Sequence, residues 1–95
     1  MRQNGNGPVT ISLTVQNELG IHARPAQHIV KLASRYKAEF FLEKDGNRVN
    51  GKSIMGVLML AAEQGSVVKL SADGEGAEDL LRDLEALFAA KFHEA

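Results

Sequence analysis

The chain has 95 residues, of which 44% are hydrophobic, and this size fits one compact domain with a modest core. With 11 Lys and Arg residues against 12 Asp and Glu residues, the formal net charge is −1, so no strongly basic field indicates nucleic-acid binding. The absence of Cys excludes disulfides and thiolate chemistry, and no apolar run approaches the roughly 20 residues that cross a bilayer.

The first third of the sequence predicts a leader, a strand and a helix. Residues 1–8 are polar and glycine-rich, which indicates a flexible N-terminal leader ahead of a single domain over residues 9–92, with 93–95 as the C-terminal end. Apolar residues then alternate with polar ones, as in a strand with one buried face, at Val9, Ile11, Leu13 and Val15. A helix is predicted from about Ala23 to Tyr36, because apolar residues recur there at helical spacing, at Ala26, Ile29, Val30 and Ala33.

The rest of the sequence predicts a hairpin, a short helix, a strand and a last helix. Alternating residues from Ala38 to Glu43, the turn dipeptide Asp45-Gly46 and the strand-like 48–50 indicate the hairpin. A helix follows Ser53 and stops before Gln64-Gly65. Alternation over 67–72 predicts the fourth strand. An apolar stripe then predicts a helix ending near Phe92, with stripe residues Ala77, Leu80, Leu81, Leu84, Leu87 and Phe88.

The predicted order of elements is β-α-β-β-α-β-α, which assigns the chain to the α+β class. Three helices with one apolar face each and four strands with one buried face each can hide those faces together only if the helices cover one side of a single sheet. We therefore predict an open-faced sandwich, with a four-stranded antiparallel sheet and three helices on one face.

The stretch from Gly20 to Ala26 contains the residues best suited to chemistry. Pro25 lacks a backbone N–H and is tolerated only in the first turn of a helix, so the helix begins close to His22. The N–H of Ala23 then points out of a helix start, which attracts anions. Arg24 adds a planar charged group that matches phosphate oxygens. Together these groups suit a phosphoryl group carried on His22.

The segment after Ser53 carries more apolar side chains than one face of a short helix can bury. We expect Met55, Met59 and part of Ile54 to be exposed beside His22, and we predict that they form, with Leu58, a small docking surface for partner proteins. Ser53 itself is a favoured helix N-cap residue.

Two motifs resemble a known family, the histidine-containing phosphocarrier (HPr) proteins of bacterial phosphotransferase systems. They are Gly-Ile-His-Ala-Arg-Pro-Ala at 20–26 and Gly-Lys-Ser-Ile-Met-Gly-Val at 51–57, and together with the order of elements the resemblance covers residues 9–92. Leu19 departs from the Asn or Ser that many members carry at this place and is similar to the nitrogen-branch relatives (NPr). This departure leaves the sugar and nitrogen branches both open.

The resemblance implies a function and a set of partners. His22 would accept a phosphoryl group on Nδ1 from enzyme I, itself charged by phosphoenolpyruvate, and pass it to a IIA domain, with Arg24 pairing with the phosphate. Ser53 would be the substrate of a kinase and a phosphatase. The protein would be a cytoplasmic monomer without a cofactor, acting as a carrier within a relay rather than as a stand-alone enzyme.

The sequence leaves two other functions open beside the carrier. One is a regulatory binding domain whose Ser53-phosphorylated form acts on a transcription factor or an enzyme. The other is a module that binds a small anion or RNA on its sheet, but four Phe, one Tyr and no basic stripe give RNA few stacking platforms. No metal site is expected, because His28 and His93 lack metal-ligand spacing with each other or with His22.

Overall fold

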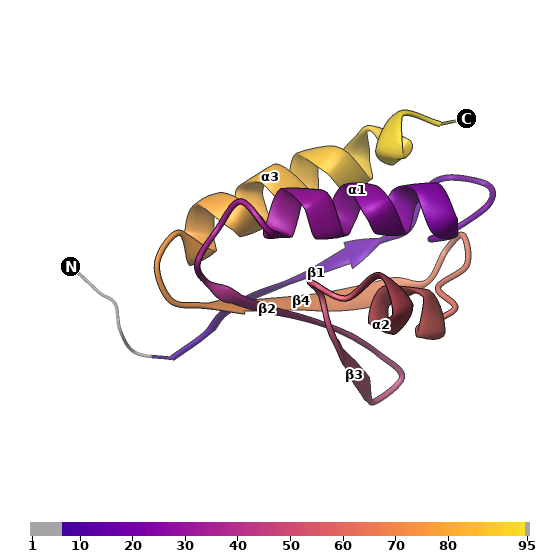
Figure 1. Ribbon diagram of the computed structural model, residues 1–95. Helices are drawn as coiled ribbons and strands as arrows, with labels where there is room; N and C mark the ends of the chain where they lie inside the picture. The colour runs from indigo at the N-terminus through magenta and orange to yellow at the C-terminus, as the bar shows by residue number, and fades with distance from the viewer. Residues whose placement is uncertain (1–6, 95) are drawn as a thin grey trace.

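The computed structural model describes residues 7–94, so residues 1–6 of the predicted leader over 1–8 lie outside the described residues. The predicted order of elements is confirmed, with one further short 3₁₀ turn, η1, near the C-terminus (Figure 1). The elements are β1 (Val9–Thr14), α1 (Ala23–Ala33), β2 (Glu39–Lys44), β3 (Asn47–Asn50), α2 (Ile54–Met59), β4 (Val67–Asp73), α3 (Ala77–Ala89) and η1 (Lys91–His93).

The four strands form one antiparallel sheet in the order β1-β4-β2-β3. The central strand β4 pairs with β1 from Val9 opposite Ala72 to Thr14 opposite Val67. All three α-helices cover the same face of this sheet, and the other face is open (Figure 1). The predicted α+β open-faced sandwich is therefore confirmed.

The core lies between the sheet and the helices. Alternate residues of β2 and β4 point into it, as the period of two in the sequence predicted, and the apolar stripes of α1 and α3 cover them. Its largest fully buried apolar side chains are Phe40, Phe88, Phe92, Ile29, Leu42, Leu70, Leu80, Leu84, Val15, Val57 and Val68.

The ends of two helices and the burial of one strand differ from the prediction. Helix α1 ends at Ala33 rather than near Tyr36, because the chain turns at Ser34 and Arg35. Helix α3 ends at Ala89, and the backbone of residues 91–93 has positive φ values that a right-handed helix does not allow. In β1, only part of each apolar side chain is buried before Val15, because β1 lies at the edge of the sheet.

A tight approach of two loops fixes where α1 begins. Gly20 has a φ of +71°, and a Cβ added there would lie 2.5 Å from the carbonyl oxygen of Ala62. The next residue, Ile21, donates its N–H to the same carbonyl at 2.9 Å. Only glycine allows this approach, which holds the start of α1 against the segment that follows α2.

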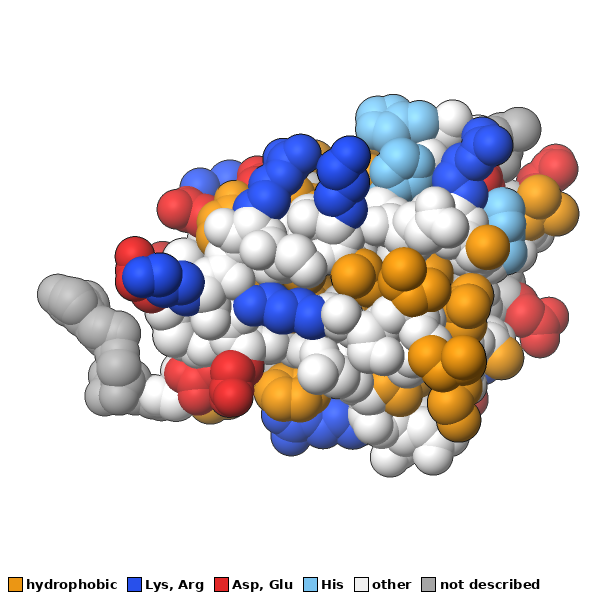
Figure 2. All heavy atoms as spheres, viewed as in Figure 1, with side chains coloured by type: hydrophobic (Ala, Val, Ile, Leu, Met, Phe, Trp, Pro, Cys, Tyr) orange, Lys and Arg blue, Asp and Glu red, His pale blue; other side chains and the backbone are white. Residues whose placement is uncertain are grey.

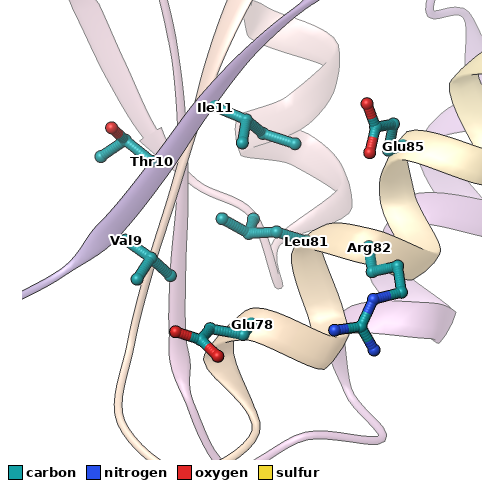
Figure 3. A pocket seen from close by; sticks show the side chains of 7 residues that line it. All are labelled: Val9, Thr10, Ile11, Glu78, Leu81, Arg82 and Glu85. Atoms are coloured by element: carbon teal, nitrogen blue, oxygen red, sulfur yellow. The ribbon is translucent and has the colours of Figure 1, made fainter. Parts of the chain in front are cut away.

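A pocket opens between β1 and α3 (Figure 3). The pocket is lined by Val9, Thr10 and Ile11 of β1 and by Glu78, Leu81, Arg82 and Glu85 of α3.

None of the described helices is long and apolar enough to cross a membrane.

Candidate functional site

Helix α1 begins as its sequence predicted. His22 is the N-cap, with extended backbone, and the first intrahelical bond runs from the N–H of Ala26 to the carbonyl of His22 at 3.0 Å. Pro25 has no N–H to lose, so the N–H groups of Ala23 and Arg24 are the donors that the helix itself leaves without a partner. These two groups and the positive end of the helix dipole make this helix start favourable for an anion.

The imidazole of His22 is held by one of its two nitrogens. Nε2 lies 2.9 Å from Oε2 and 3.1 Å from Oε1 of Glu94, and the side chain of His22 is 38% exposed. Within residues 7–94, Nδ1 has no hydrogen-bond partner. The ring is therefore fixed through Nε2 while Nδ1 remains available for chemistry.

The side chain of Glu94 also has a hydrogen bond with Asn17, which is fully buried in the loop before α1. The Asn17 Nδ2 donates to Oε1 of Glu94 at 3.0 Å and to the carbonyl of Gly20 at 2.7 Å. The pKa of Glu94 lies below its usual value, chiefly because of the hydrogen bond with His22. The Asn17 amide and the charges of His22 and Arg24 act in the same direction, and partial burial opposes them.

Glu94 and Asn17 were not predicted from the sequence. Glu94 is 72 residues away from His22 along the chain, and its contact with the ring follows from the left-handed backbone of residues 91–93. The sequence has no periodic pattern that would predict the left-handed backbone of residues 91–93. A buried Asn five residues before a histidine is the only local signal, and the sequence alone does not show that it is buried.

The guanidinium of Arg24 is exposed at the second position of α1. It lies close enough for its charge to lower the pKa of Glu94. The structure therefore places the three predicted residues, His22, Ala23 and Arg24, next to one another at the start of α1. Their chemical roles remain predictions.

Ser53 caps α2, as predicted. Its Oγ accepts the N–H of Gly56 at 3.1 Å, and its side chain is half-buried. The hydroxyl therefore has a structural role in this fold, and its phosphorylation remains a prediction.

The α2 patch consists of Ile54, Met55 and Met59, which are 41%, 68% and 75% exposed. Their exposure was predicted from the surplus of apolar residues, whereas Leu58 is half-buried against the core. Helices α1 and α2 pack against each other, and Figure 2 shows apolar side chains over α2 on the face that also carries histidines. Leu19, exposed in the loop before His22, was not predicted as part of a surface.

The two remaining histidines form an edge-to-face ring pair, with the centroids of His28 and His93 6.3 Å apart. His28 is half-buried and His93 is exposed. In residues 7–94, no group of three or more His, Asp or Glu residues is arranged to hold a metal ion.

Comparisons with known proteins agree on one family. Residues 9–90 match the profile of the family described as PTS-HPr, the PTS HPr component phosphorylation site. The phosphocarrier protein HPr of Neisseria meningitidis is 42% identical to this chain over 83 residues, which are 87% of this chain and 93% of that protein. The HPr-like protein Crh of Bacillus subtilis is 46% identical over 72 residues, which are 76% of this chain and 85% of Crh.

A solved structure gives the same result. The crystal structure of HPr from Thermoanaerobacter tengcongensis superimposes with a TM-score of 0.88 at 41% identity, and the match covers 92% of this chain and 98% of that one. This chain therefore belongs to the HPr family, the phosphocarrier proteins of the phosphotransferase system.

Proposed function

We propose that this protein accepts a phosphoryl group on Nδ1 of His22 from phosphoenolpyruvate-charged enzyme I and passes it to a IIA domain. One observation carries the proposal: a half-exposed imidazole at the N-terminus of α1, with Nε2 engaged and Nδ1 without a partner in the described chain. The proposed carrier works as a cytoplasmic monomer that meets one partner at a time.

The chemistry asks mainly for positioning and for stabilisation of negative charge. Nδ1 attacks the phosphorus, and the phosphoryl oxygens come to lie near the start of α1. There the N–H of Ala23 and the guanidinium of Arg24 donate hydrogen bonds to them. The same groups stabilise the phosphohistidine until an acceptor arrives.

The experiment that tests the carrier function uses enzyme I and labelled phosphoenolpyruvate. We expect a single label that is labile in acid and stable in base, as phosphohistidine is. The label should be absent from His22→Ala and present in His28→Ala and His93→Ala, which serve as matched controls. A label that persists in His22→Ala would refute the assignment.

Both partners have to approach His22, and we propose that they dock on the α2 patch. Met55→Glu places a charge in an apolar interface, so phosphoryl transfer from enzyme I and to the IIA domain should both slow by about tenfold or more. The measurement is the rate of each half-reaction. Val67→Glu is the control, because Val67 is 59% exposed on the open face of the sheet. Equal rates in Met55→Glu and the control would rule out this surface.

Regulation through Ser53 is a further part of the proposal. A phosphate there adds roughly two negative charges beside the α2 patch, so docking should weaken while the fold persists. Ser53→Asp should therefore reduce transfer in the enzyme I assay, whereas Ser53→Ala should transfer normally and lose only about 0.5–2 kcal/mol of stability with its cap. Normal transfer by Ser53→Asp would argue against the switch.

The likeness to the HPr-like protein Crh supports a second candidate, a regulatory domain whose Ser53-phosphorylated form binds a transcription factor or an enzyme. The labelling experiment separates the two functions. A chain that takes no label at His22 from enzyme I but is phosphorylated at Ser53 by a protein kinase would be a regulator and not a carrier.

A further inference from the structure

We propose that Glu94 is a positioning residue for phosphoryl carriage: its carboxylate accepts the Nε2–H of His22 and thereby keeps the Nδ1 lone pair free for attack. The inference rests on the proposed function and deepens it, because it assigns a role to a residue outside both sequence motifs. The contact joins the C-terminal segment to the start of α1 across 72 residues of sequence.

The carboxylate of Glu94 is held firmly enough to orient a ring. Its side chain is only 14% exposed, so water screens the contact with His22 less than it would at an open surface. Asn17 donates to Oε1 from a fully buried position, and the neighbouring Phe92 is also fully buried, with its ring 4.8 Å from that of Phe88. Asn17 therefore holds the Glu94 side chain from the loop before α1, and the buried Phe92 anchors the backbone next to Glu94 in the core.

The protonation of the pair follows from its chemistry. An ionised carboxylate has no hydrogen to donate, so the short contact of 2.9 Å requires that Nε2 of His22 carries the hydrogen. In a neutral imidazole only one nitrogen carries a hydrogen. Nδ1 is then the nitrogen with the free lone pair, and it is also the one without a partner in residues 7–94.

The same contact assists the transfer step. The Nδ1 lone pair forms the new N–P bond while the donor's bond to phosphorus breaks, and the electron pair of that bond leaves with the donor. The hydrogen stays on Nε2, so the ring becomes a phosphorylated imidazolium whose positive charge lies against Glu94. In the onward transfer the N–P electron pair returns to Nδ1 and the ring becomes neutral again. Glu94 thus stabilises the charged ring in both directions.

Replacing Glu94 by Gln should change the tautomer of the His22 ring, and not only remove a hydrogen bond. Asn17 donates to Oε1, so the Gln amide oxygen should remain on that side. The amide NH₂ would then take the place of Oε2, 2.9 Å from Nε2 of His22. An NH₂ group only donates, so this contact, the shorter of the two that Nε2 makes, favours Nε2 as the acceptor and the hydrogen of the neutral ring on Nδ1. That tautomer blocks the nucleophile.

The test combines the ¹⁵N NMR signals of the His22 ring with phosphorylation by enzyme I. In the unchanged protein, held at a pH where the ring is neutral, the Nε2–H tautomer should dominate. Glu94→Gln should shift the ring toward Nδ1–H, and its rate of phosphorylation should fall roughly ten- to a hundredfold, by analogy with the loss when a partner that orients a metal-bound histidine is removed. Glu94→Ala removes the acceptor without adding a donor, so the tautomers should mix and the rate should fall less.

Glu85→Gln is the matched control, because Glu85 is exposed on α3 and belongs to the pocket beside β1. It should match the unchanged protein in both readouts. A ring with unchanged tautomers and an unchanged rate in Glu94→Gln would overturn the inference. If enzyme I does not label the protein that carries no substitution, the proposed function is refuted instead. The tautomer measurement would still show whether Glu94 orients the His22 ring.

Discussion

Gly51 shows how closely a single residue position can be constrained in this fold. A Cβ added there would lie 2.1 Å from Cδ2 and 2.4 Å from Cε2 of Phe40, whose ring is fully buried. Gly51→Ala should therefore push the ring off its position and cost about 1–3 kcal/mol of stability, as overpacking does. The measurement is the free energy of unfolding in urea.

Gly46→Asn is the control for that substitution. A Cβ at Gly46 meets nothing within 4 Å, and Asn tolerates the positive φ of the hairpin turn that Asp45 and Gly46 share. It should change stability by less than about 0.5 kcal/mol. Equal losses in Gly51→Ala and Gly46→Asn would show that the contact with Phe40 does not limit the position.

At the same scale, local sequence was enough to find some site residues and not others. His22, Arg24 and Pro25 are neighbours, and the properties of Pro25 place a helix start between them. Glu94 reaches the same ring only after the chain has folded, and nothing in the sequence around it differs from a charged surface tail. Asn17 is polar and yet fully buried, against the usual preference of its type.

Among the elements, α2 is the least able to form alone, because it has only six residues. Ser53 satisfies its first turn, and Lys44 of β2 closes the other end by donating from Nζ to the carbonyls of Leu60 at 3.3 Å and Ala61 at 3.1 Å. The positive charge of Lys44 also complements the negative end of the helix dipole. One strand thus fixes the helix that carries the α2 patch.

Lys44→Met should weaken this end of α2. We expect a loss of about 1 kcal/mol, because the side chain is largely covered and its two hydrogen bonds to carbonyls disappear. The hydrogen-exchange rate of the backbone amides should increase more in α2 than in α1. Lys37→Met, at an exposed position outside the helices, should leave both quantities unchanged. If the two variants behave alike, Lys44 does not stabilise the helix.

The elements themselves were largely predictable because each has a simple period. The alternation of apolar and polar residues predicted β2 and β4, and the apolar stripes predicted α1 and α3. In each case a single buried face determines where the apolar residues lie along the sequence. The edge strand β1 was predicted as more buried than it is, because period reveals which face turns inward but not how well neighbours cover it. The contacts of Lys44 with α2 involve residues about 16 apart and leave no pattern at all.

For the whole molecule, the site depends on three segments that only the fold brings together. The loop before α1 supplies Asn17, the start of α1 supplies His22, and the C-terminal segment supplies Glu94, which is 77 residues away from Asn17. An unfolded chain does not maintain these contacts. Protonation of Glu94 should therefore be linked to folding, which makes the site visible in the stability of the entire protein.

The direction of that linkage follows from the lowered pKa of Glu94. A carboxyl group whose pKa is lower in the folded state adds stability that is fully present above its ordinary, unfolded value. That stability is lost as the pH falls through the folded value, because the folded carboxylate then takes up a proton as well. Glu94→Gln has no group to titrate there. The stability advantage of the unchanged protein over Glu94→Gln should thus shrink steadily as the pH falls from above 4.5, the ordinary pKa of the carboxyl group, through the lower pKa of the folded protein.

Urea unfolding at several pH values in that window measures the advantage directly. In Glu85→Gln the exposed carboxyl is replaced on α3, so its stability should stay parallel to that of the unchanged protein across the window. Curves for the unchanged protein and Glu94→Gln that also run parallel would mean that the carboxylate gains nothing from His22 and Asn17 on folding. A converging pair, with Glu85→Gln parallel, would tie the acid stability of the fold to the contact between Glu94 and the His22 ring.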